Sequence, residues 1–112
     1  MATKVRFAGD VIIVEVMGKM MGGPETDECH DQVREVLAGG HKKVVMDLSG
    51  AEWVNSRGMG SLMACYVSNQ RLGGDLRFAA VTDKTRSLFH IAKLDTVFQV
   101  FDTVGDAIAS FE

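Results

Sequence analysis

Residues 43–63 of the chain read KVVMDLSGAEWVNSRGMGSLM, and this stretch decides the fold. Its first part belongs to a strand predicted over residues 42–50, in which two lysines precede the apolar residues Val44, Val45, Met46 and Leu48, as in a strand buried in a parallel sheet. Its last part begins a series of apolar residues at the helical spacing i, i+3, i+4, i+7 and i+8, namely Met59, Leu62, Met63, Tyr66 and Val67. The polar patch Asn55-Ser56-Arg57-Gly58 lies between them. The stretch therefore predicts a strand, a polar turn and an amphipathic helix.

The rest of the chain alternates between the same two patterns. Strands are expected at residues 4–7, 11–17, 75–81 and 97–101. Helices are expected at residues 25–37, between Arg57 and Leu72, around Leu88, Phe89, Ile91 and Ala92 after a cap at Asp83 or Thr85, and after a cap at Thr103. The order β-β-α-β-α-β-α-β-α predicts an α/β fold with a small, mixed, mostly parallel sheet. We expect an N-terminal β-hairpin and about four helices that cover one face of the sheet.

Length and composition set the class of protein. The chain has 112 residues, of which 46% are hydrophobic and one is proline, so we expect one packed domain over residues 1–112. The formal net charge is −3, and acids and bases are mixed along the chain. Because no basic stripe collects phosphate-binding charge, nucleic acid is not expected as a direct partner.

Cysteine, histidine and hydropathy patterns indicate where the protein acts. Cys29 and Cys65 lack CxxC spacing and are expected to be reduced. The three histidines share no ligand spacing, so we expect no metal and no cofactor. Neither a signal peptide nor an apolar run long enough to span a bilayer is present. We therefore expect a cytoplasmic protein without a membrane association.

Catalysis and nucleotide binding find weak support in the sequence. Ser56 lacks the GxSxG context, and Asp47 and Glu52 fit solvated acids at a strand end about as well as a catalytic pair. The segment GKMMGGPET, residues 18–26, matches neither the P-loop nor the dinucleotide fingerprint. Glycines that adopt positive φ explain it more simply. We therefore expect no enzyme, and a nucleotide site near Gly18–Pro24 is a minor alternative.

Two features indicate a surface for a protein partner. Met20 and Met21 fall in the predicted glycine-flanked loop, where adaptable thioethers suit a partner contact, although one of them could instead plug the sheet edge. Asn55 or Ser56 is suited to N-cap the following helix. A phosphate on Ser56 would lie at the positive end of that helix, and it would repel a surface docked over it. Position alone does not choose between a cap and a switch.

The sequence resembles a STAS domain of the anti-sigma factor antagonist type over nearly its whole length. The resemblance rests on KVVMDLSGAEWVNSRGMGSLM, on GGDLRFAAV (residues 73–81) and on TRSLFHIAKLDTVFQVFDTVGDAI (residues 85–108). It implies a partner switch in which the unphosphorylated protein binds an anti-sigma factor with GHKL-type serine kinase activity and frees a sigma factor. Phosphorylation on Ser56 would end binding, and a PP2C-type phosphatase would restore it.

The sequence departs from the family's Asp-Ser-Ser-Gly pattern at two positions. Asn55 replaces the acid, and Arg57 replaces the second serine. Arg57 could hold a phosphate through a charge-assisted hydrogen bond, or it could make Ser56 a poor kinase substrate. The alternative function is a constitutive STAS scaffold or transporter-associated subunit that is never phosphorylated. The expected partner-binding residues are Asn55, Ser56, Arg57, Gly58, Met59, Met20 and Met21.

Overall fold

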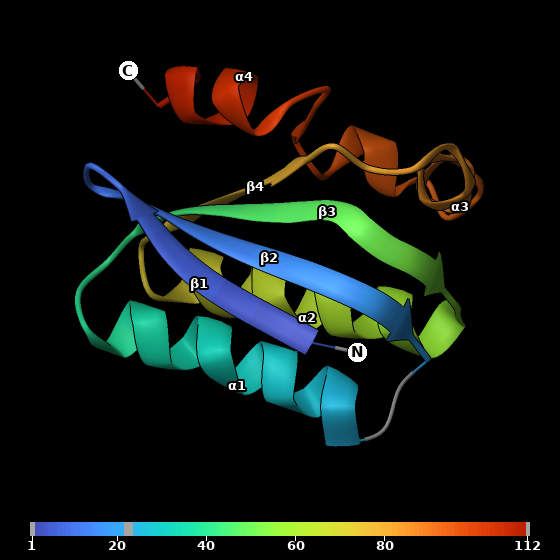
Figure 1. The fold of residues 1–112 in the computed structure, drawn as a ribbon, viewed down its shortest axis with the longest axis horizontal. Helices are drawn as coiled ribbons and strands as arrows, with labels where there is room; N and C mark the ends of the chain where they lie inside the picture. Colours follow the sequence, from blue (N-terminus) through green and yellow to red (C-terminus); the bar gives the residue numbers. More distant parts are fainter. Residues whose placement is uncertain (1, 22–23, 112) are drawn as a thin grey trace.

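The structure is a computed structural model that describes the backbone of residues 2–21 and 24–111 and the side chains of residues 3–21 and 30–111. Figure 1 shows the arrangement of the elements. The strands are β1 (Ala2–Ala8), β2 (Val11–Met20), β3 (Lys43–Val54), β4 (Asp75–Ala79) and β5 (Val100–Phe101). The helices are α1 (Pro24–Ala38), α2 (Ser56–Arg71), α3 (Asp83–Ile91) and α4 (Val104–Ala109), with a 3-10 turn at Leu94–Thr96.

The five strands form one sheet in the order β1-β2-β3-β4-β5. β1 and β2 pair antiparallel, and β2, β3, β4 and β5 pair parallel to their neighbours. A helix connects each pair of adjacent parallel strands, as parallel pairing requires. The predicted mixed sheet with an N-terminal hairpin is confirmed.

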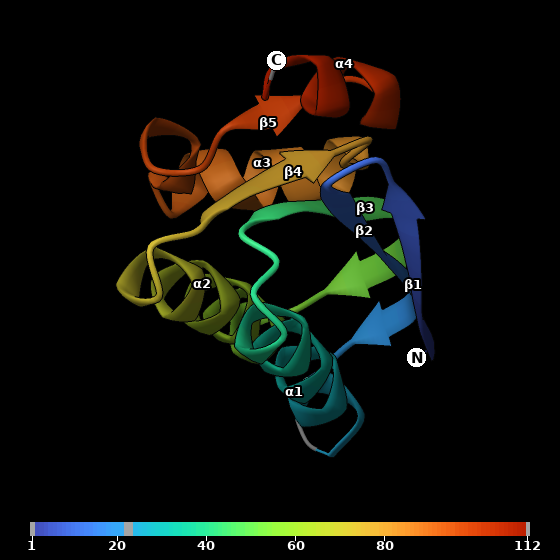
Figure 2. The same ribbon diagram turned by 90° about the vertical axis from the view of Figure 1, so that its left-hand side faces the viewer.

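The helices lie on both faces of the sheet, so the expectation of a single covered face was wrong (Figure 2). α1 and α2 pack on one face, against Ile12 and Val14 of β2. On the other face, Val11 and Ile13 of the same strand pack with Ala107 of α4. Successive side chains of a strand point to opposite faces, and β2 is apolar at both sets of positions. The continuous apolar run thus needed cover on both faces.

Aromatic side chains close the core beside β4. Phe78 of β4 lies with its ring centroid 5.8 Å from Phe89 of α3 and 4.5 Å from Phe98, and Tyr66 of α2 lies 5.2 Å from Phe98. The structure corrects two details here. Thr82 caps α3, in place of Asp83 or Thr85. The last strand is shorter than the predicted run 97–101, because a 3-10 turn precedes it.

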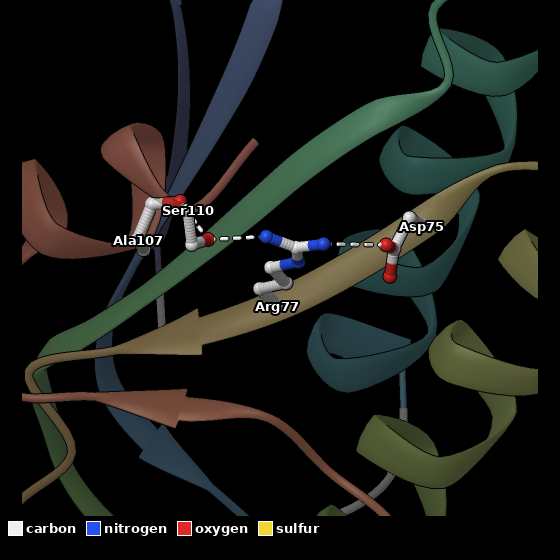
Figure 3. Close-up of polar contacts among 4 residues, drawn as sticks. All are labelled: Asp75, Arg77, Ala107 and Ser110. Atoms are coloured by element: carbon white, nitrogen blue, oxygen red, sulfur yellow. Dashed lines mark hydrogen bonds and ion pairs between the residues drawn. The ribbon is translucent and has the colours of Figure 1, made fainter. Parts of the chain in front are cut away.

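Arg77 of β4 holds the C-terminal helix to the sheet, as Figure 3 shows. Its guanidinium lies 2.8 Å from a carboxylate oxygen of Asp75 and also donates to the Ser110 hydroxyl. The same group lies 4.0 Å from the centre of the Phe111 ring, which is a cation–π distance. The predicted cap of α4 is confirmed, because the Thr103 hydroxyl accepts the Asp106 N–H at 3.0 Å.

Over the length that the two strands pair, β3 contains more residues than β2 does. Glu15 pairs with Asp47 and Lys19 with Trp53, with register shifts between them on β3. Such bulges change which face the following side chains point to. The two shifts together add two residues to β3, so the alternation that points Met46 and Leu48 into the core returns at Val54. Trp53 is 45% exposed, whereas Val54 is 2% exposed and faces the core.

The aromatic core gives the first prediction. Replacing Phe78 by alanine removes a fully buried ring that contacts two others, and should lower the free energy of unfolding by about 3–5 kcal/mol. Phe7→Ala is the matched control, because Phe7 is 63% exposed and its loss should cost about 0.5 kcal/mol. Urea unfolding followed by circular dichroism measures both. Equal losses would show that the described core is misplaced.

Candidate functional site

Asn55 joins the end of β2 to the start of α2. Its side-chain oxygen accepts the Gly58 N–H at 2.8 Å, which makes it the N-cap of the helix. Its side-chain amide donates to the carbonyl of Met21 at 3.0 Å, and its backbone N–H donates to the carbonyl of Met20 at 3.1 Å. One residue thus satisfies groups on both elements.

Ser56 is the first residue of α2 and is not its cap. The sequence left the cap open between Asn55 and Ser56, and the structure assigns it to Asn55. The Ser56 side chain is exposed, and its hydroxyl makes no hydrogen bond to any residue the structure describes. This hydroxyl is therefore accessible without a change in the fold.

Met20 and Met21, both predicted to contact a partner, differ in exposure in the structure. Met20 is the last residue of β2, outside the predicted loop, and its side chain is fully buried. Met21 follows it and is 44% exposed. The change comes from β2 extending past Gly18, so that Met20 points into the core. Only Met21 presents its side chain at this surface.

Gly58 lies against the end of β2. A Cβ atom added there would overlap the carbonyl oxygen of Met20 and lie 2.9 Å from its carbonyl carbon. The residue is buried, so its part in the site is to let α2 approach the strand closely. Its neighbours Arg57 and Met59 differ: Arg57 is exposed, and Met59 is half-buried against the core.

Two adjoining hollows open beside Ser56, and together we call them the Ser56 groove. The first, of about 500 Å³, is lined by Trp53, Val54, Asn55, Ser56, Lys84, Thr85, Ser87 and Leu88. The second, of about 270 Å³, is lined by Asn55, Ser56, Met59, Leu88, Ile91 and Ala92. The groove therefore lies between the start of α2 and one side of α3.

Sequence reasoning missed the α3 side of the groove. It placed Ile91 on the third helix without assigning it a role, and in the structure Ile91 is the last residue of α3 and is 76% exposed. Lys84 carries no sequence motif, and it lines the same hollow as Ser56 because the fold places the start of α3 near the start of α2. The sequence signal that could have indicated this side of the groove is the apolar residue Ile91 at the end of a helix.

The groove lacks the groups of a hydrolytic site. No histidine lines either hollow. His30 lies 3.1 Å from the Ser68 hydroxyl and His90 lies 2.9 Å from Asp95, away from Ser56. The carboxylate of Asp47 accepts the backbone N–H of Ser49 at 3.0 Å, within β3. Within the described residues, no cluster of potential metal ligands is found. The same part of the chain contains no helix with the length and apolarity needed to cross a membrane.

A family model described as "STAS domain" matches residues 2–107. The match covers nearly all of the fold described above, including every strand and both sides of the groove. The chain belongs to the STAS domain family.

Anti-sigma factor antagonists are among the proteins that this chain is similar to. The anti-sigma-F factor antagonist RsfB of Mycobacterium tuberculosis is 31% identical over 80 residues, which are 70% of this chain and 63% of RsfB, so less than two thirds of that relative is matched. A crystal structure of an anti-sigma factor antagonist from Mycobacterium paratuberculosis superposes with a TM-score of 0.85 at 27% identity, over 97% of this chain and 92% of that one.

The Bacillus cell fate determinant SpoIIAA, in its phosphorylated form, shares the fold. Its TM-score is 0.76 at 12% identity, over 99% of this chain and 100% of SpoIIAA. The expected STAS fold is confirmed by these superpositions.

The close approach at Gly58 gives a prediction with an internal control. Gly58→Ala should destabilise the protein by more than about 2 kcal/mol, because the added methyl has no room against the Met20 carbonyl. Gly60→Ala should be neutral or stabilise by up to about 1 kcal/mol, because a Cβ there meets nothing within 4 Å and alanine favours a helix. Thermal and urea unfolding measure both. The reverse order would contradict the described contact.

The double role of Asn55 gives a second prediction. Asn55→Ala removes the cap and the bond to Met21, and should cost about 2 kcal/mol. Asn55→Asp keeps the cap acceptor and gains a favourable charge at the helix start, but cannot donate to the Met21 carbonyl. Its stability should fall between alanine and wild type in urea unfolding. An aspartate variant more stable than wild type would contradict this order and show that the charge at the helix start outweighs the hydrogen bond to Met21.

Proposed function

We propose that this STAS domain is an anti-sigma factor antagonist whose Ser56 is the phosphoacceptor of a partner switch. The unphosphorylated form binds an anti-sigma factor with GHKL-type serine kinase activity and so releases a sigma factor. Phosphorylation of Ser56 ends this binding, and a PP2C-type phosphatase restores it. The domain itself has no catalytic role in this scheme.

The observation that carries the proposal is that the N-cap of α2 is Asn55 and not the proposed phosphoacceptor Ser56. Asn55 holds the start of α2, and the Ser56 hydroxyl is exposed at the first helical position without a hydrogen bond to a described residue. A kinase can therefore reach the hydroxyl, and a phosphate there breaks no bond that the fold needs. Negative charge is favourable at a helix N-terminus. The names of the mycobacterial relatives and the phosphorylated form of SpoIIAA support the same assignment.

The effect on a docked partner follows from the added charge. A phosphate brings a charge of about −1.5 to −2 at neutral pH into a surface that the partner must desolvate. A penalty of about 3 kcal/mol weakens a complex roughly a hundredfold. The exposed surface around Ser56, with Trp53 and Met21 each nearly half exposed, is the face that the partner covers in this proposal.

The two departures from the family pattern bear on the proposal differently. The side-chain amide of Asn55 donates a hydrogen bond to the Met21 carbonyl, which an aspartate could not do. The replacement of the family's acid by Asn55 therefore does not argue against a switch. Arg57 is exposed and has no ion pair within the described part of the chain. Its guanidinium favours one of two outcomes: it binds the phosphate of the neighbouring serine, or it lowers recognition by the kinase.

If Arg57 prevents recognition by the kinase, the alternative function applies: a constitutive scaffold or transporter-associated subunit that is not phosphorylated. The observation in its favour is the cation at Arg57, where the family pattern has a second serine. Intact mass and phosphopeptide mapping of the protein from its own cells separate the two. A phosphate on Ser56 supports the switch, and its absence under growth and stress supports the scaffold.

The switch predicts how charge at Ser56 affects binding. Ser56→Asp should weaken binding to the cognate kinase partner by about a hundredfold, whereas Ser56→Ala should bind as the wild type does. Ser49→Asp adds the same charge at an exposed position of β3 outside the groove and is the matched control. Calorimetry with the partner captured from the native cells gives the affinities. Equal binding by the two Ser56 variants would rule the mechanism out.

A further inference from the structure

The Ser56 groove is a continuous, mostly apolar surface. Its two hollows share Asn55, Ser56 and Leu88, so they form one channel across the start of α2. Trp53 stands at one end and is 45% exposed, and Ile91 stands at the other and is 76% exposed. Large apolar side chains gathered around a concave surface are typical of interaction sites, where their burial drives binding.

The residues that line the Ser56 groove carry positive charge only. Among the residues that line the two hollows, Lys84 is the only charged one. Its ammonium lies 5.0 Å from the centre of the Trp53 ring and makes no ion pair with a described residue. A cation in the first turn of a helix does not benefit from the helix dipole, so helix stability does not account for it. Its charge is therefore available to a bound group.

We propose that the Ser56 groove binds a partner segment in which an apolar side chain lies next to a carboxylate. The apolar side chain packs between Trp53 and Leu88, and the carboxylate pairs with Lys84. Resting on the proposed function, this segment belongs to the anti-sigma factor, and Lys84 and Ile91 become specificity residues outside the polar patch around Ser56. A phosphate on Ser56 would then compete for the groove directly, because both hollows include Ser56.

A small probe tests the groove without a partner. 3-Phenylpropionate has a ring beside a carboxylate, and 3-phenylpropanamide has the same shape without the charge. Titrated into ¹⁵N-labelled protein, the acid should shift the Trp53 indole and the α3 resonances and bind about threefold more tightly than the amide. Lys84→Gln should remove the preference. Arg86→Gln should retain it, because Arg86 lies on the same helix but pairs with Asp102.

Three results of this titration would overturn the proposal. The first is equal binding of acid and amide to the wild type. The second is shifts confined to residues outside the groove. The third is a dependence of the groove resonances on protein concentration before any probe is added, which would assign the groove to a second copy of the chain. The protein has one tryptophan, so fluorescence of Trp53 provides an independent readout.

Binding to the anti-sigma factor separates this inference from the proposed function. Lys84→Glu and Ile91→Ser should each weaken that complex about tenfold, while Arg86→Glu, outside the groove, should not. If Ser56→Asp weakens the complex and the two groove variants do not, the switch stands and the groove assignment is wrong. If the groove variants weaken it and Ser56→Asp does not, the groove stands and the switch is wrong.

Discussion

The contact between the end of β2 and the start of α2 fixes the position of Asn55, Ser56 and Gly58. Parallel pairing of β2 with β3 extends to their last residues, Met20 and Val54, and only Asn55 separates Val54 from the start of α2. The first N–H groups of a helix need acceptors, and the end of a strand leaves carbonyls that need donors. Asn55 meets both needs at once, and Gly58 leaves room for the approach. The orientation of Ser56 is thus set by the sheet, with no flexible loop between them.

Two neighbouring residues have different roles: Asn55 caps α2, and Ser56 presents an exposed side chain. The stability of α2 depends on Asn55, whereas Ser56 has no partner among the described residues that its modification would remove. A regulated residue that also capped the helix would change the fold whenever it was modified. In the proposed switch, a phosphate on Ser56 would alter the surface alone, because the cap of α2 lies on Asn55.

Much of this could be predicted from local sequence patterns. The strand pattern of residues 42–50 and the helical spacing from Met59 onward are local signals, and they gave the strand, the helix and the STAS resemblance. Met20 and Met21 could not be told apart, because their orientation depends on how far β2 continues beyond Gly18. The α3 wall of the groove was also missed. Lys84 and Ile91 reach Ser56 through tertiary packing, which no short-range pattern encodes.

The bulged pairing of β3 limits how this segment can change in evolution. Between Asp47 and Trp53 the strand tolerates different side chains at its exposed positions, but its length is constrained by the pairing with β2. Deleting one residue at either register shift would remove a bulge together with its local bend and twist, while Trp53 and Val54 could keep their pairing with Lys19 and Met20. The two extra residues of β3 therefore contribute to the twist and direction with which the strand reaches Asn55 and Ser56.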